Sequence, residues 1–310
     1  MDNQNNIFAN VSPPKPLSET RRFFQSQNFF SQIGFLCLVM VVFVILLKVI
    51  TKIMVKIFTP SKSPYLLKNL KPANIPTTIS QNPSVANSVP IIRSTNQKDG
   101  IEFTYNIWMF INGIPELTEK KFHQVFFKGN TNSPIARGSD YPDLSVLPKK
   151  VFKILGNDLS GINYPDNGPG LYLTQLTSIG KNANTLGLVI IMNTFRNILE
   201  PIVIPDIPFK KWLCATIRVM GRNIDVYING IIVKRMILRD IPKQNYGDVY
   251  INNNKGFDGS VSALRYYNYG LNAREIYNIV ASGPNIVADD SILVTPPYYS
   301  SDWYFDDDKM

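Results

Sequence analysis

The residues that could carry out chemistry are few and stand apart along the chain. His123 is the only histidine, which speaks against a histidine-rich metal site and against a serine triad, since the triad needs a histidine base. We expect His123 to be a surface residue of a strand. Glu102, Asp225 and Asp248, the acidic residues of the expected strands, each stand alone, so no acid and nucleophile pair for glycoside hydrolysis is present. Phosphate-loop, zinc and dinucleotide-binding motifs are also absent. The sequence therefore predicts neither an enzyme nor a cofactor.

The cysteines and the charge balance indicate a reducing compartment and a membrane surface. Cys37 lies in an apolar run and Cys214 in an expected strand, environments too different for the two to pair. Only Asn10 heads a glycosylation triplet, because Pro83 follows Asn82. The net charge is +9 and the clearest basic cluster lies beside the apolar run. This favours a membrane surface over nucleic acid as the partner.

The apolar run predicts a membrane-spanning helix. No charged residue occurs between Phe29 and Leu47, a length close to the ~20 residues that cross a hydrocarbon core. A cleaved signal peptide is not expected, because a long segment precedes the run and lysines follow it. The sequence therefore predicts a single transmembrane helix in residues 29–58, with lipid contact through residues 29–50.

Lysines at a spacing of four continue this helix. Lys48, Lys52 and Lys56 would share one stripe of it, from which their ammonium groups can reach a phospholipid surface. More basic residues follow the run than precede it, which by the positive-inside rule predicts that the C-terminal side faces the cytoplasm. The counted residues are Lys15, Arg21 and Arg22 before the run, and Lys48, Lys52, Lys56, Lys62, Lys68 and Lys71 after it.

The rest of the chain predicts an all-β domain behind a tether. Residues 1–28 look unstructured, and prolines recur among polar residues in 59–97, which predicts a linker. From residue 98 short alternating runs predict strands, and Asn229-Gly230 predicts a two-residue hairpin turn. A short helix follows with Asn272 as N-cap and Glu275 three residues on, and we expect it to form a lid over a sheet edge.

The C-terminal half carries a motif pattern of a known superfamily. A strand headed by tryptophan precedes an apolar-Tyr-apolar-Asn-Gly hairpin, and FDGSVSALRYYNYGLNAREI closes the domain. Residues 98–284 resemble the laminin-G-like and pentraxin-like branch of the concanavalin A-like lectin/glucanase superfamily, most clearly after residue 200. The matching residues are Trp212, Tyr227, Asn229, Gly230, Phe257, Gly259, Arg265, Tyr267, Asn268, Leu271, Glu275 and Ile276. The resemblance implies a two-sheet antiparallel jelly-roll sandwich with one short C-terminal helix.

The same resemblance suggests which ligands to consider. The carboxylate triplet E-x-D-x-E of the glucanases is missing. Many members bind calcium through loop oxygens, for which the candidates are Asp140, Asp143, Asp158, Asp166, Asn163 and Asn167. The alternative is that these residues make turns. Sugar rings could stack on Tyr164, Tyr172 or Trp303, although loop aromatics also serve packing.

Residues 285–310 form an aromatic and acidic tail, which we expect either to dock on a protein partner or to be a flexible end. Its candidate anchors are Tyr298, Tyr299, Trp303, Tyr304 and Phe305. The first functional hypothesis is a membrane-anchored structural or interaction protein with protein neighbours. The chain is similar in organisation to virion proteins of large DNA viruses that link an internal membrane to a capsid shell. The alternative is a membrane-bound lectin that captures a glycan.

Overall fold

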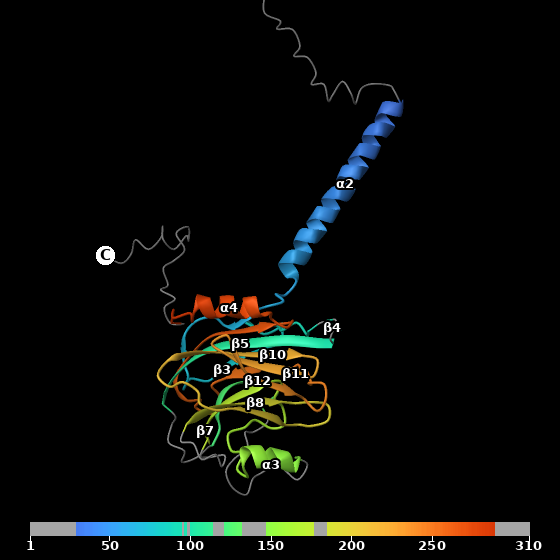
Figure 1. Ribbon diagram of the computed structural model, residues 1–310. Coiled ribbons are helices and arrows are strands. Elements are labelled where there is room, and N and C mark those ends of the chain that lie inside the picture. Colours follow the sequence, from blue (N-terminus) through green and yellow to red (C-terminus); the bar gives the residue numbers. More distant parts are fainter. Residues whose placement is uncertain are drawn as a thin grey trace, which may run out of the picture. The chain divides into compact units, whose positions relative to one another are not determined.

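The computed structural model describes residues 29–94, 96–97, 100–113, 121–131, 147–176 and 185–288 (Figure 1). The chain divides into two units between Thr59 and Pro60. The first unit contains helix α2 (Phe29–Phe58), in which no residue is buried. By length and composition α2 can cross a membrane, and an apolar helix near the N-terminus is also typical of a signal sequence. Lys48, Lys52 and Lys56 are exposed on it.

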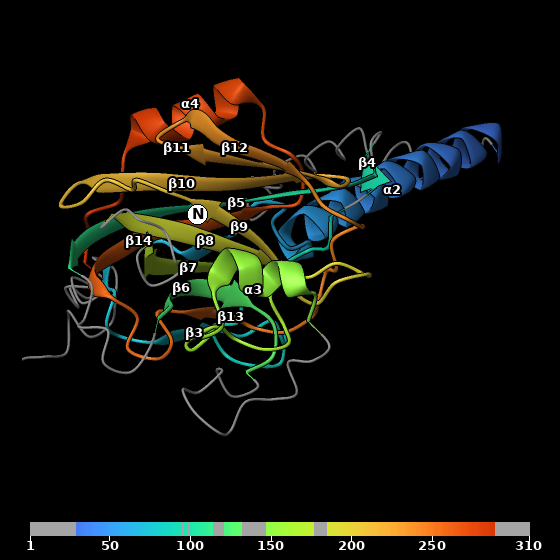
Figure 2. The ribbon, with the colours of Figure 1, turned by 60° about the horizontal axis from the view of Figure 1, so that its bottom comes forward.

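The second unit is a two-sheet sandwich, as predicted, and the strands described here are antiparallel (Figure 2). Sheet A has the order β1 (Tyr65–Leu67), β14 (Asp258–Tyr267), β5 (Gly100–Gly113), β10 (Trp212–Met220), β11 (Asn223–Ile228) and β12 (Ile231–Ile237), with β2 (Lys71–Pro72) on β14 and β4 (Asn96–Gln97) on β5. Sheet B has the order β3 (Thr77–Ile79), β13 (Val249–Ile251), β6 (His123–Lys128), β7 (Gly170–Gln175), β8 (Leu186–Met192) and β9 (Glu200–Ile204).

The core lies between the inner faces of the two sheets, as the alternation along the strands predicts. In β5, Phe103, Tyr105 and Ile107 point inward and are buried. They meet residues of sheet B, and the ring of Tyr105 stacks on that of Phe126 at 5.6 Å between centroids. Successive strand residues face opposite sides, so the intervening residues of sheet A form an outer face that is free to carry polar groups.

The predicted hairpin and helix start are both confirmed. Asn229 and Gly230 have φ angles of 49° and 83°, as a type I′ turn requires. Helix α4 (Ala273–Ser282) begins with a reciprocal capping box between Asn272 and Glu275. Its position differs from the expected lid over an edge. Ile276 of α4 packs with residues from β11 and β14, which lie on either side of the central strands, so α4 covers the outer face of sheet A.

A second short helix, α3 (Lys149–Leu155), was not predicted. Val151 and Leu155 are buried and pack against Tyr172 and Val189 on the outer face of sheet B. The two helices therefore cover opposite outer faces, and Figure 1 shows α4 and α3 at opposite sides of the strands. The sequence signal was the apolar spacing of four within KKVFKIL, in a helix too short to stand out.

The prediction of a linker over residues 59–97 is wrong for much of its length. This segment supplies β1 and β2 to sheet A and β3 to sheet B, and Leu66, Leu67 and Ala73 are buried. The domain therefore begins near residue 60 rather than at 98. β1 and β3 fit between prolines and β2 includes Pro72, so a composition typical of a linker did not reveal these strands of two or three residues.

Arg265 of β14 fastens this segment to sheet A. Its Nε donates to the carbonyl of Ser63 at 3.0 Å, and its guanidinium carbon lies 4.4 Å from the centre of the Tyr65 ring. The predicted start of the tail is also part of the fold. Asn285 Nδ2 donates to the carbonyl of Lys68 at 3.0 Å. Residues 285–288 thus belong to the sandwich, and the tail proper, 289–310, lies outside the described residues together with its five anchors.

Candidate functional site

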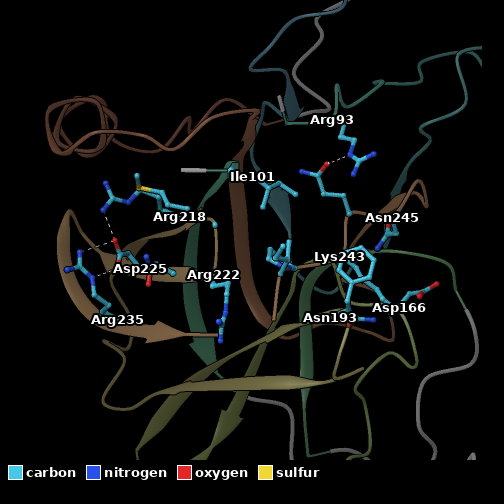
Figure 3. Close-up of a pocket in the computed structure, with 18 residues that line it drawn as sticks. Arg93, Ile101, Asp166, Asn193, Arg218, Arg222, Asp225, Arg235, Lys243 and Asn245 are labelled. Atoms are coloured by element: carbon cyan, nitrogen blue, oxygen red, sulfur yellow. Dashed lines mark hydrogen bonds and ion pairs between the residues drawn. The ribbon is translucent and has the colours of Figure 1, made fainter. Parts of the chain in front are cut away.

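A groove of about 1260 Å³ opens at the end of the sandwich where β5 begins and β10 ends. The turn between β10 and β11, the loop after β8 and the loop before β13 complete its walls (Figure 3). Among the described lining residues, five side chains are basic and two are acidic. These are Arg93, Arg218, Arg222, Arg235 and Lys243, against Asp166 and Asp225. The groove therefore carries an excess of positive charge.

One wall consists of an ion triad that crosses three neighbouring strands. Antiparallel pairing places Asp225 between Arg218 and Arg235 on the outer face of sheet A. One carboxylate oxygen of Asp225 accepts a hydrogen bond from Arg218 Nη2 at 2.5 Å. The other accepts a hydrogen bond from Arg235 Nε at 2.6 Å. Burial opposes ionisation of Asp225, but the hydrogen bonds from Arg235 and Arg218 outweigh it and hold the pKa of this carboxyl below its usual range. The single carboxylate thus faces two guanidinium groups.

The other cations of the groove have neutral hydrogen-bond acceptors or aromatic partners. Arg222 donates to the carbonyl of Leu238 from Nε at 3.0 Å and from Nη2 at 2.8 Å. Arg93 Nε donates to Gln244 Oε1 at 3.1 Å, and Lys243 Nζ lies 5.7 Å from the centre of the Phe195 ring. These contacts orient the cations without neutralising them. The side chains of Arg93, Arg222 and Lys243 are exposed.

Lys128 holds the loop that forms one side of the groove. Its Nζ donates to the carbonyl of Gly247 at 2.6 Å, and its own carbonyl accepts from Asn245 Nδ2 at 2.9 Å. Burial lowers the pKa of Lys128 to about 8, partly opposed by the nearby carboxylate of Asp248. The side chain and the backbone carbonyl of Lys128 therefore both attach the loop over 245–247 to β6.

The calcium candidates that the structure describes act mainly as ties within loops. Asn163 Nδ2 donates to the carbonyl of Asp166 at 2.7 Å, and Asn167 Nδ2 donates to the carbonyl of Asn163 at 2.7 Å. Asp158 accepts from the Ser160 amide at 3.0 Å. Asp140 and Asp143 lie outside the described residues. Within the residues described, no group of three or more His, Cys, Asp or Glu side chains could hold a metal ion.

Other candidate residues serve packing. Tyr172 is fully buried and presents no free ring for a sugar, and Tyr164 is partly buried against the cluster around it. Trp303 lies outside the described residues. The expectation of a surface position for His123 is wrong, because it is 7% exposed on β6 and its Nδ1 lies 3.0 Å from the carbonyl oxygen of Gly256.

The isolated strand carboxylates also hold backbone groups. Asp248 Oδ1 accepts from the Gln81 amide at 2.7 Å, and Glu102 Oε2 accepts from the Gly270 amide at 3.3 Å. Sequence reasoning did not find the five cations of the groove, because they are far apart in the chain. The available signal was their position at strand ends and in turns. This signal indicates a shared site only when the strand order is known.

Comparisons with known proteins identify structural similarity alone. No family model matches the chain, and no curated protein matches it. Among solved structures, the binding domain of botulinum neurotoxin DC in complex with rat synaptotagmin II is 13% identical, with a TM-score of 0.36, over 59% of this chain and 36% of that one. A crystal structure of a receptor binding domain is 12% identical, with a TM-score of 0.37, over 59% of this chain and 35% of that one. The chain thus spans little more than a third of the length of these solved chains.

Proposed function

We propose that the chain is a single-pass membrane protein whose sandwich is a binding module for an acidic protein partner. The observation that carries this proposal is the basic groove, in which Arg93, Arg222 and Lys243 are exposed and have no carboxylate partner among the contacts described above. Positive charge in a concave site favours anionic partners and accelerates their association. On this proposal the chain is an interaction protein and not an enzyme.

The shape and lining of the groove favour a protein segment over a neutral sugar. Aromatic rings offer the apolar faces on which a neutral sugar can stack, and among the described lining residues of the groove Phe195 alone is aromatic, against five basic side chains. Guanidinium groups such as that of Arg93 suit carboxylates, with which they form directional hydrogen bonds. Acidic protein neighbours assembled next to a membrane, such as a capsid shell over an internal virion membrane, would present such groups.

In this proposal α2 is the helix that anchors the chain in the membrane. None of its residues is buried, and a bilayer would cover the exposed apolar side chains. Lys48, Lys52 and Lys56 would then lie near phosphate groups on the cytoplasmic side. The sandwich and its groove would accordingly face the cytoplasm.

The first prediction concerns this arrangement. In sealed vesicles with the cytoplasmic side outward, added protease should remove the chain from about residue 60 onward and leave a small lipid-protected fragment that contains α2. Mass spectrometry of the protected fragments measures this directly. Complete protection of the sandwich, or a mature protein that lacks residues 29–58 because a signal peptidase has removed them, would refute the anchored topology.

The second prediction concerns the groove. The double substitution Arg93→Glu and Lys243→Glu should weaken binding of a fluorescent oligoglutamate peptide to the full chain in nanodiscs at least about tenfold, because two attractive charges become repulsive. Fluorescence anisotropy at several salt concentrations measures this, and the affinity of the unaltered protein should fall as salt rises.

The matched control is the pair Lys149→Glu and Lys153→Glu on the exposed side of α3, which changes the net charge equally away from the groove. If this pair lowers affinity as much as the groove pair, net charge explains the binding and the groove does not. A sulfated heparin oligosaccharide and a neutral dextran serve as further probes. Tighter, groove-dependent binding of the oligosaccharide would replace the protein-binding proposal with the lectin alternative.

A further inference from the structure

β12 is the last strand of sheet A, and one of its two edges is open. It pairs with β11 along its length, for example Met236 with Ile224 and Arg235 with Asp225. In the part of the chain that the structure describes, no strand pairs with the other edge of β12. An open edge presents backbone N–H and C=O groups that can hydrogen-bond to an additional strand.

The side chains of β12 are unusually apolar for an open edge. Ile231 is 71% exposed and Ile237 is 67% exposed, and Ile232 and Val233 between them are 44% and 45% exposed. Proteins normally protect such edges against association, since an exposed apolar strand is a template for pairing. Four exposed large apolar residues on a seven-residue strand indicate a surface that is covered in use.

Two features of the edge restrict what can cover it. The register with β11 shifts between Val226 and Tyr227, which makes Val233 an extra residue and bends the strand. Lys234 lies opposite Val226, whose side chain points into the core, so Lys234 is on the inner side of the strand and yet exposed. An inward lysine excludes a purely apolar strand, because the charge would lose its water. It can be satisfied by a carboxylate on the added strand.

A second copy of the chain is a poor occupant. If two β12 strands paired antiparallel over their full length, Lys234 would lie opposite Lys234, and like charges directly opposite destabilise a sheet. Arg235, with 63% of its side chain exposed, and the exposed Arg239 add positive charge on and beside the strand. The charge pattern therefore fits an acidic strand.

We infer that the open edge of β12 binds an extended segment of another protein in which acidic residues alternate with apolar ones. Backbone hydrogen bonds to β12 supply most of the affinity, as in other cases of strand addition. Because side chains alternate across a strand, one face of the segment places a carboxylate at Lys234. The opposite face packs apolar side chains on Ile232 and Ile237. This site adjoins the groove, because Arg235 of β12 also lines the groove.

The experiment uses the full chain with Arg93→Glu and Lys243→Glu in nanodiscs, so that groove binding does not contribute. The probe is a fluorescent peptide of alternating glutamate and valine. A copy with alternate amides N-methylated on one edge cannot pair along that edge, and it should bind at least about tenfold more weakly. Two copies are tested, each methylated on a different edge of the peptide. The copy whose methylated edge faces β12 should bind more weakly than the other.

Charge at Lys234 is tested in the same background. Lys234→Glu should weaken binding of the glutamate-valine peptide about fivefold or more. The same variant should bind a lysine-valine peptide more tightly than the protein with Lys234 does. Lys153→Glu on α3 is the control of equal charge, and thermal unfolding verifies that each variant is folded. The inference is overturned if the N-methylated copies bind as tightly as the parent peptide, if Lys234→Glu has no effect, or if the parent peptide shows no saturable binding.

Discussion

A chain of residues 98–310 is expected to remain unfolded, whereas a chain of residues 60–310 is expected to fold. The shorter chain lacks β1, β2, β3 and β4, and with them the buried side chains of Leu66 and Leu67. Burying one leucine contributes about 1.5–3 kcal/mol. Together with the lost strand pairing, the deletion should cost more than about 5 kcal/mol, which is comparable to the whole stability of a typical domain. Circular dichroism and urea unfolding of the two chains measure this.

Point substitutions separate the packing of this segment from the mere length of the chain. Leu67 is 5% exposed, so Leu67→Ala should lower the free energy of unfolding by about 3 kcal/mol. Ile75 lies in the same segment and is 51% exposed, so Ile75→Ala should change stability little. A cooperative urea transition of 98–310 at the midpoint of the longer chain would show that residues 60–97 are a linker after all.

The second large effect is expected at the ion triad. Asp225→Ala should lower the free energy of unfolding by about 3 kcal/mol, because Arg218 would remain largely buried without its carboxylate. The depressed pKa of Asp225 means that its stabilisation is present above the ordinary value of 3.8 and is lost as pH falls through the folded pKa. The difference between the two proteins should therefore shrink in acid. Thermal unfolding of the full chain in detergent at several pH values measures both effects.

Arg235→Ala provides the matched control for this triad. It removes the partner of Asp225 that has 63% of its side chain exposed, and solvent can replace that partner. Its cost should be much smaller than that of Asp225→Ala, because Arg218 keeps its ion pair. Equal losses for the two substitutions would show that Arg218 is not the residue that needs the carboxylate.

Most of the sandwich was predictable because its strands alternate and its turns have distinctive chemistry. The inward residues of β5, the Asn229-Gly230 turn and the cap at Asn272 follow from local rules, and the structure confirms them. Residues shared with the superfamily pattern have structural roles, as expected. Gly259 is one example, since a Cβ there would lie 2.0 Å from the carbonyl oxygen of Phe110. Membership of that superfamily stays a prediction.

The errors have a common physical cause. β1, β2 and β3 and helix α3 are too short to produce a periodic signal, and only long-range pairing holds them in place. The basic groove could not be predicted for a related reason. Arg93 and Lys243 line the same groove although 150 positions separate them in the chain, and no local pattern records this. The tail anchors from Tyr298 to Phe305 stay a prediction.

The early attachment of the chain to β14 changes how far the sandwich could reach. The amide of Thr59 still bonds to the helix at Val55, and the carbonyl of Lys62 already accepts from Asn268. The connector between them can extend about 11 Å, against about 100 Å for a stretched linker over 59–97. On the proposal that α2 is a membrane anchor, a connector this short would limit binding to partners at the same membrane surface, where their effective concentration is high. Lengthening the connector with glycine and serine would then lower the effective concentration of the binding sites at the surface without altering any contact within them.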